Sequence, residues 1–179
     1  MLSAGVGSRY VVVSGPAASG KTVLAHAIAE ELGWPLIAKD TIKAGLMSIR
    51  SPSDVESARQ VGHAAVAVLL ALAEEARGAA VLEAVWRHDQ GRDRLSSLPG
   101  PVVEVFCHCN RSLLETRYAT RARRPGYVPE HRHPSELWSP ETFEPVALGW
   151  TVVEVDTTNE VDVGAVVSAI RRELDRTAP

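Results

Sequence analysis

The sequence predicts an α/β fold in which helices flank a parallel β-sheet. Short runs of β-branched residues alternate along the chain with longer helical stretches, which is the pattern of such folds. The first run, residues 10–14, is continuously apolar, as expected for a strand that is buried on both faces. A glycine-bounded turn and a helix follow it directly. The 179 residues, of which 45% are hydrophobic, suit one domain spanning residues 1–179.

Glycine and proline mark the boundaries of the expected elements. Gly33 lies just beyond the first helix, Gly78 ends the longest one, and Pro-Gly-Pro at residues 99–101 stops a polar helix. We expect strands at residues 10–14, 35–38, 79–85, 102–107 and 150–155. We expect helices at residues 21–32, 41–49, 55–77, 89–98, 112–120 and 161–174.

Residues 121–140 interrupt this alternation. They are rich in Arg, His and Pro and show almost no apolar periodicity. So long an irregular segment inside a compact domain is usually functional or mobile, and we interpret residues 119–140 as a lid. His131 and His133 form an isolated pair without further ligands nearby, which is a weak indication of a metal site.

Composition and charge argue against several classes of protein. The net charge of −3 gives no general attraction for nucleic acids or anionic membranes. Two cysteines, Cys107 and Cys109, are too few for a disulfide framework. The N-terminus lacks the features of a signal peptide, and no stretch approaches the ~20 apolar residues of a membrane span. We therefore expect a soluble, cytoplasmic protein; nothing in the sequence specifies its oligomeric state.

Residues 15–22, Gly-Pro-Ala-Ala-Ser-Gly-Lys-Thr, fit the phosphate-binding motif G-x-x-x-x-G-K-[ST] between a strand and a helix. Its glycines let backbone N–H groups turn toward phosphates, and the helix N-terminus adds positive potential. Lys21 is expected to reach the β- and γ-phosphates of ATP, and the Thr22 hydroxyl to hold Mg²⁺. The alternative is an ordinary glycine-rich turn. The expected nucleotide contacts here are Gly15, Ala17, Ala18, Ser19, Gly20, Lys21, Thr22 and Val23.

Two carboxylates lie at or near the carboxyl ends of predicted strands, where ligands of open α/β sheets bind: Asp40 follows the second strand, and Glu83 lies late in the third. Asp40 is the candidate that orients the attacking hydroxyl and accepts its proton; the alternative is a helix N-cap. Glu83 lies in an apolar strand and is expected to act on Mg²⁺ or substrate; the alternative is a strand-end charge that reaches solvent. Of the four tryptophans, which we expect to pack, Trp86 is the one placed to line an acceptor pocket. The expected acceptor contacts are Asp40, Lys43, Glu83 and Trp86.

Arginines gather at the end of the predicted helix 112–120. Arg117 and Arg121 are four residues apart and share a helix face, where like charges repel unless an anion lies between them. Phosphoryl transfer needs cations that neutralise the transferred group, so we assign both arginines a catalytic role and Arg121 a nucleotide contact. The alternatives are a solvated basic surface or contact with RNA.

Taken together, these segments resemble a predicted-kinase branch of the P-loop superfamily. The residues that carry the resemblance are 15–22, 39–43, 80–84 and 153–158. The branch groups with chloramphenicol phosphotransferase and, more distantly, with zeta toxins, gluconate kinases and polynucleotide kinases. The resemblance implies a three-layer α/β/α fold with a five-stranded sheet of order 2-3-1-4-5, ATP-dependent phosphotransfer and an arginine-bearing lid.

The resemblance also implies roles for single residues. It supports Asp40 as the group that activates the acceptor hydroxyl, and it places Asp156 and Thr157 beside the adenine of the nucleotide. For Asp156 a cap or turn in the last loop is an equal alternative. Many relatives carry Asp where this chain has Glu83, and residues 123–138 do not match the lid of the chloramphenicol enzyme. The acceptor of that enzyme is therefore not transferred to this chain.

The leading hypothesis is a kinase that moves the γ-phosphoryl group of Mg-ATP to a hydroxyl of a small molecule. Antibiotic, sugar and nucleoside-like acceptors all stay open. One alternative is a nucleotide-dependent ATPase or switch module that signals to a partner through the predicted lid. Another is a polynucleotide 5′-hydroxyl kinase, suggested by the arginines, although the negative net charge argues against a long nucleic-acid track.

Overall fold

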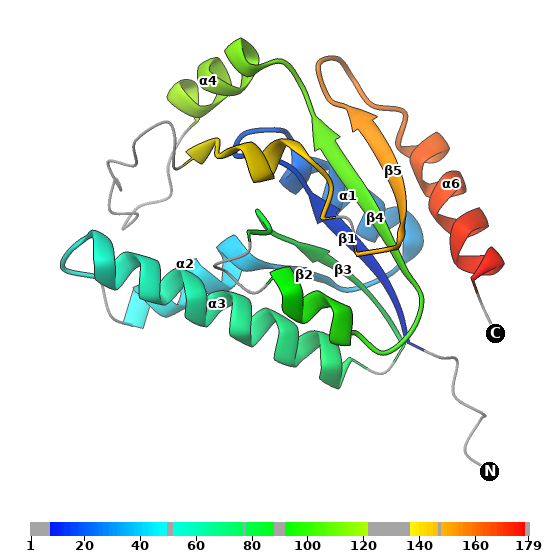
Figure 1. The fold of residues 1–179 in the computed structure, drawn as a ribbon, viewed down its shortest axis with the longest axis horizontal. Helices are drawn as coiled ribbons and strands as arrows, with labels where there is room; N and C mark the ends of the chain where they lie inside the picture. Colours follow the sequence, from blue (N-terminus) through cyan, green and yellow to red (C-terminus); the bar gives the residue numbers. More distant parts are fainter. Residues whose placement is uncertain are drawn as a thin grey trace.

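The computed structural model describes residues 8–49, 52–76, 78–87, 92–121, 137–146 and 148–177. These residues form a five-stranded, all-parallel sheet of order β2-β3-β1-β4-β5 (Figure 1). The strands are β1 (Arg9–Ser14), β2 (Leu36–Ala38), β3 (Ala79–Glu83), β4 (Val102–His108) and β5 (Thr151–Asp156). The predicted fold class and the strand order implied by the resemblance are therefore confirmed.

Helices cover both faces of the sheet. The α-helices are α1 (Lys21–Leu32), α2 (Lys39–Ile49), α3 (Val55–Glu75), α4 (Arg111–Thr120) and α6 (Val163–Arg176), and the 3₁₀ helices are η2 (Arg92–Ser97) and η3 (Pro140–Phe143). Figure 1 shows α1 and α6 on one side of the sheet and α2 and α3 on the other. This gives the three-layer α/β/α arrangement that is typical of parallel sheets.

Two hydrophobic cores lie on opposite faces of the sheet and share its central strand. Val11 and Val13 of β1 belong to the core under α1 and α6, whereas Tyr10 and Val12 belong to the core under α3. Successive side chains of a strand point to opposite faces, so a central strand between two helical layers must be apolar at every position. The run of apolar residues that predicted this strand is continuous because β1 is buried on both faces of the sheet.

Most element boundaries differ from the expected ones by only one or two residues. β3 ends at Glu83 rather than at residue 85: Glu83 pairs with Ala38, the last residue of β2, and with Val13, one residue before the end of β1. The helix expected at 89–98 is a 3₁₀ helix at Arg92–Ser97, and residues 88–91 lie outside the described part. Residues 122–136, most of the predicted lid, also lie outside it.

The register brings the carboxyl ends of all five strands to one edge of the sheet. β1 runs into the phosphate-binding motif there, and β2 runs directly into α2. Ser14 pairs with Phe106 of β4, and His108 of β4 pairs with Asp156 at the end of β5. The predicted site residues follow or end these strands, so the topology collects them at a single edge. Among the described helices, none has both the length and the apolar character needed to cross a membrane.

Candidate active site

The phosphate-binding motif forms a tight turn between β1 and α1. Gly15 and Gly20 have φ angles of 131° and 79°, in the left-handed region that glycine adopts without a steric penalty. A Cβ on Gly15 would lie 2.2 Å from the Cys107 carbonyl oxygen, so β4 leaves no room for a side chain. Gly20 is the N-cap of α1 and provides no side-chain cap. The first-turn N–H groups of α1 are thus presented to a ligand, as anion sites at helix N-termini require.

Ala18 is the one strained residue of this turn. Its φ of 66° is left-handed, and it is the only residue other than glycine with a positive φ in the described ranges. For an L-amino acid with a Cβ this conformation costs roughly 1–2 kcal/mol. Such strain persists only where the surrounding structure holds it, and it concentrates at functional sites.

Lys21 and Thr22 are the first two residues of α1, directly after the turn. Lys21 is buried, and its Nζ donates to the Pro16 carbonyl at 3.1 Å. The Thr22 hydroxyl donates to Glu83 Oε1 at 3.2 Å. This bond joins the two residues predicted to hold magnesium, which are 61 positions apart in the sequence.

Glu83 is a buried carboxylate beneath the phosphate-binding turn. Its side chain is only 2% exposed, which excludes the alternative of a strand-end charge in solvent. Burial raises the pKa of Glu83; the Lys21 charge opposes this rise, and the Asp40 charge adds to it. Oε2 has no hydrogen-bond partner among the described residues. A buried carboxylate oxygen without a partner, beside a threonine hydroxyl, is a fitting donor set for a hard cation such as Mg²⁺.

Magnesium does not need a large set of protein ligands. No group of three or more His, Cys, Asp or Glu side chains with metal-binding geometry occurs within the described ranges. Mg²⁺ usually keeps several waters and takes one or two protein ligands together with nucleotide phosphates. Thr22 and Glu83 are sufficient for that mode of binding.

Asp40 lies in the first turn of α2, at the edge of the sheet next to Glu83. Because α2 begins at Lys39, Asp40 is inside the helix and is not its N-cap. Its side chain is exposed and therefore accessible to a substrate, while its charge acts on Glu83. The predicted acceptor residue Lys43 lies one turn further along α2 and is 3% exposed.

Lysine is used in this chain only around the site. The sequence has three lysines, Lys21, Lys39 and Lys43, and their exposed fractions are 7%, 8% and 3%. All other basic residues among the 19 Lys and Arg are arginines. The charges of Lys21 and Lys39 both lower the pKa of Glu83, so two of the three act on the same carboxylate. Lysines are rarely buried without a specific partner or function, which favours a functional role for this group.

Arg117 contacts the loop after β5. Its NH2 donates to the Thr157 carbonyl at 2.8 Å, and its NH1 lies 3.5 Å from the Thr157 hydroxyl. That hydroxyl in turn donates to the Ser19 carbonyl at 2.7 Å. Arg117 is thus connected to the β4–β5 side of the phosphate-binding turn, whereas Glu83 lies on its β3 side. Arg121, at the C-terminal end of α4, is exposed.

The remaining predicted residues occupy varied positions. Asp156 accepts a hydrogen bond from the Thr158 N–H at 2.8 Å, which forms the loop turn that was the alternative to an adenine contact. Hydrogen bonds from the Thr158 side chain and then from its N–H lower the pKa of Asp156. Val23 is 77% exposed on α1. Trp86 is 4% exposed within the core under α3, and its Nε1 has no partner among the described residues. Its burial favours packing, and its contact with an acceptor stays a prediction.

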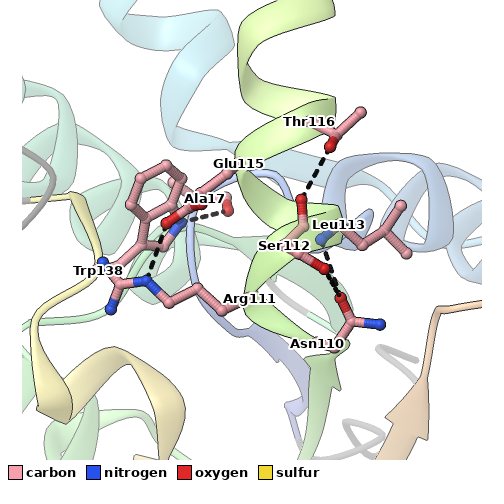
Figure 2. Close-up of polar contacts among 8 residues, drawn as sticks. All are labelled: Ala17, Asn110, Arg111, Ser112, Leu113, Glu115, Thr116 and Trp138. Carbon is pink, nitrogen blue, oxygen red and sulfur yellow. Dashed lines mark hydrogen bonds and ion pairs between the residues drawn. The ribbon is translucent and has the colours of Figure 1, made fainter.

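Sequence reasoning missed two buried polar contacts near the site. Glu104, fully buried in β4, accepts from the Ser14 hydroxyl at 2.5 Å and from the Val146 N–H at 2.8 Å. Trp138 donates its indole N–H to the Ala17 carbonyl at 3.1 Å (Figure 2). Glu104, like Glu83, is an acidic residue in an otherwise apolar strand, so the sequence did contain an indication of its buried polar contact. The Trp138 contact spans 121 sequence positions and has no local signal.

Comparison with known proteins identifies the family of this chain. The AAA_33 family, described as an AAA domain, matches residues 11–137. A candidate kinase from Chloroflexus aurantiacus J-10-fl has a TM-score of 0.78 at 26% identity, and the match covers 96% of this chain and 98% of that one. A gluconokinase from Sinorhizobium meliloti 1021 has a TM-score of 0.58 at 25% identity, with 93% and 91% of the two chains covered.

A more distant likeness shows the fold alone. Shikimate kinase from Acinetobacter baumannii, solved in complex with shikimate, has a TM-score of 0.56 at 18% identity, with 93% of this chain and 91% of that one covered. Curated protein sequences give no match. With its phosphate-binding turn, its 2-3-1-4-5 sheet and a family match over more than half of its length, the chain belongs to the AAA_33 family and to the P-loop kinase group.

Proposed function

We propose that the protein is a Mg²⁺- and ATP-dependent kinase that phosphorylates a hydroxyl group of a small molecule. The observation that carries the proposal is the contact of Thr22 with the buried Glu83, beside Asp40 and beneath the phosphate-binding turn. A cradle for phosphates, a pair of oxygen ligands and an accessible carboxylate are the parts that phosphoryl transfer requires.

Each residue has a distinct task in this mechanism. Backbone N–H groups of residues 15–22 bind the phosphates, and Lys21 neutralises charge on the transferred group. Mg²⁺, held by Thr22 and Glu83, would neutralise the β- and γ-phosphates when bound. The oxygen of the acceptor hydroxyl forms a bond to the γ-phosphorus, and Asp40 accepts the proton of that hydroxyl. At the same time the bond between the γ-phosphorus and the β,γ-bridging oxygen breaks, and ADP leaves.

Arg117 and Thr157 act on the nucleotide in this proposal. Their contact on the β4–β5 side of the turn supports a role for Arg117 in binding ATP. Arg121 and the lid at about residues 119–140 supply further cations toward the transferred group. Asp156 borders the adenine, and residues 1–179 act as one catalytic domain.

The acceptor approaches from the side of α2 and of the segment that follows β3. Asp40, Lys43 and Trp86 are the proposed contacts, together with Glu83. The gluconokinase and shikimate kinase relatives suggest a small hydroxylated metabolite, within the sugar, antibiotic and nucleoside-like classes. The thiols of Cys107 and Cys109 are free and buried, which supports work in a reducing compartment such as the cytoplasm.

The experiment compares Asp40→Asn with the unchanged protein. Each is incubated with Mg-ATP and a panel of sugars, nucleosides, hydroxy acids and antibiotics, and phosphorylated products are detected by mass spectrometry. We expect Asp40→Asn to lower transfer at least 100-fold and to leave ATP affinity unchanged. The exposed Asp175, paired with Arg9 at 3.5 Å, gives the matched control Asp175→Asn, which should retain full activity.

One result would count against the proposed role of Asp40, and another against the kinase function. Equal transfer rates for Asp40→Asn and the unchanged protein would exclude Asp40 as the base. ATP hydrolysis without any phosphorylated acceptor in the panel would favour the ATPase or switch alternative.

A further inference from the structure

The tryptophan that follows the undescribed segment 122–136 reaches back to the phosphate-binding turn. Trp138 is 6% exposed, and its indole N–H donates to the Ala17 carbonyl at 3.1 Å. Figure 2 shows its side chain directed at that carbonyl, with the Arg111 side chain alongside. The contact connects a distant part of the chain to the backbone that is expected to bind phosphate.

The Ala17 carbonyl belongs to the peptide plane next to the strained residue. A peptide unit is planar, so the oxygen of Ala17 and the nitrogen of Ala18 move together. The φ angle of Ala18 is the rotation about the bond that begins at that nitrogen. A hydrogen bond that fixes the Ala17 oxygen therefore also restrains the φ of Ala18 at its left-handed value of 66°.

The indole ring of Trp138 is restrained by contacts with two side chains. The Arg111 guanidinium lies 5.6 Å from the ring centroid of Trp138, and Tyr118 contacts the ring edge-on with a centroid distance of 5.6 Å. Arg111 is held by Glu115 at 3.0 Å, one turn along α4. Leu114, fully buried in the same cluster, packs α4 onto this contact. A donor held in this way can impose a direction on its acceptor.

We propose that Trp138 is a positioning residue that holds the phosphate-binding turn in its ligand-binding conformation. Glycine at position 18 would adopt the left-handed conformation without strain. Alanine does not, so in this chain the conformation depends on an external restraint, which the Trp138 hydrogen bond supplies. The inference goes beyond the proposed reaction and uses the proposed function only for the choice of nucleotide as probe.

A double-mutant cycle tests this dependence. Trp138→Phe removes the N–H donor and keeps an aromatic ring for Arg111 and Tyr118. Binding of the non-hydrolysable analogue Mg-AMP-PNP is measured by calorimetry for the unchanged protein, Trp138→Phe, Ala18→Gly and the double variant. Trp150→Phe is the matched control, because Trp150 lies just before β5, at the opposite end of the sheet from the turn.

We expect Trp138→Phe to weaken AMP-PNP binding about tenfold in the Ala18 background. With glycine at position 18 the same change should weaken binding less than threefold, because the turn no longer needs the restraint. A purely structural role of Trp138 would give the same loss in both backgrounds. Trp150→Phe should bind as the unchanged protein does.

Three results would overturn the inference. One is an affinity of Trp138→Phe within twofold of the unchanged protein, and another is an equal loss in both backgrounds. The third applies if Trp138→Phe alone does not fold, in which case the AMP-PNP affinities of Ala18→Gly and of the double variant are compared. A tenfold difference between these two affinities contradicts the inference. Absence of AMP-PNP binding by the unchanged protein would instead refute the proposed function.

Discussion

Two buried glutamates lie on the strands that flank β1, and their side chains face opposite sides of the sheet. Glu83 ends β3 and pairs in register with Val13, so it points toward the α1 face of the sheet. Glu104 lies in the middle of β4 and pairs with Val12, so it points toward the α3 face. Each side chain has one oxygen without a partner among the described residues. The sequence signal, an acid in an apolar strand, is the same for both.

The surroundings of the two carboxylates decide what each can do. Glu83 contacts Thr22 and lies within the fields of Lys21, Lys39 and Asp40. The Glu104 Oε1 atom accepts from the Ser14 hydroxyl and from the Val146 N–H, and thereby fixes the segment after η3 to the sheet. We use the name reactive edge for the carboxyl ends of the strands with the turn at residues 15–22, and the name scaffold for the rest of the sheet and its helices. We interpret Glu83 as part of the reactive edge and Glu104 as part of the scaffold. The two residues are of the same type, so the difference between their surroundings comes from their register in the sheet and from their distance to the end of the strand.

The largest expected effect is on catalysis by Glu83→Gln. This change keeps the shape and one acceptor oxygen and removes the charge that would face Mg²⁺. We expect kcat to fall about 100-fold. The matched change Glu104→Gln, on the other strand, should alter kcat less than threefold. Steady-state kinetics of both variants at saturating Mg-ATP checks the contrast, and similar losses in the two would remove the distinction between edge and scaffold.

The second prediction concerns stability, for which Glu104 rather than Glu83 is the residue expected to matter. Glu104→Leu leaves the Ser14 hydroxyl and the Val146 N–H without their buried acceptor, so we expect the free energy of unfolding to fall by about 2 kcal/mol. Glu104→Gln retains a carbonyl acceptor and should lose less than half of that. Denaturant unfolding of the two variants measures the difference. Equal stability of Glu104→Leu and the unchanged protein would contradict the scaffold role.

The sequence predicted most of the fold because its signals are local. The apolar run of β1, the glycines of the turn and the alternation of segments each depend on a few neighbouring residues. Glu83 was predicted because it stands out within one short strand, and its contact with Thr22 follows from the register of β1 and β3.

The missed contacts depend on residues that only the folded chain brings together. Glu104 meets Val146 across 42 sequence positions, and Trp138 meets Ala17 across 121. The attachment of Arg117 to Thr157 has the same non-local character. The strain at Ala18 was equally invisible, because the motif permits any residue at that position.

A third prediction compares one substitution in the reactive edge and in the scaffold. Ala18→Gly relieves left-handed strain but increases the entropy of the unfolded chain, so its free energy of unfolding should change by less than about 1 kcal/mol. Ala64, exposed on α3, lies in an ordinary helix, where Ala64→Gly should lower stability by about 1 kcal/mol. Thermal unfolding of both proteins provides the comparison; a larger loss at Ala18 than at Ala64 would contradict the strain.

The smallest expected effect is a pH dependence in the scaffold. Asp54 caps α3, and the hydrogen bond from the Ser57 N–H lowers its pKa below the ordinary value of 3.8. A lowered pKa in the folded state contributes stability that is present above pH 3.8 and is lost as the pH falls through the folded value. Asn is an equally good cap without a charge.

Asp54→Asn should therefore lose less stability on acidification than the unchanged protein does. The difference between the two proteins is constant at neutral pH and shrinks below pH 3.8. Urea unfolding at pH 7 and at pH 3 measures it. A difference that grows toward low pH would show that the sign is wrong.

The central claim is that the backbone between β1 and α1 binds the terminal phosphates of a nucleotide together with Mg²⁺. Titration of the unchanged protein with AMP-PNP, with and without Mg²⁺, tests this claim before any acceptor is known. We predict saturable binding that Mg²⁺ strengthens and that Lys21→Ala weakens. A folded protein that binds neither adenine nor guanine triphosphates in the presence of Mg²⁺ would contradict the account.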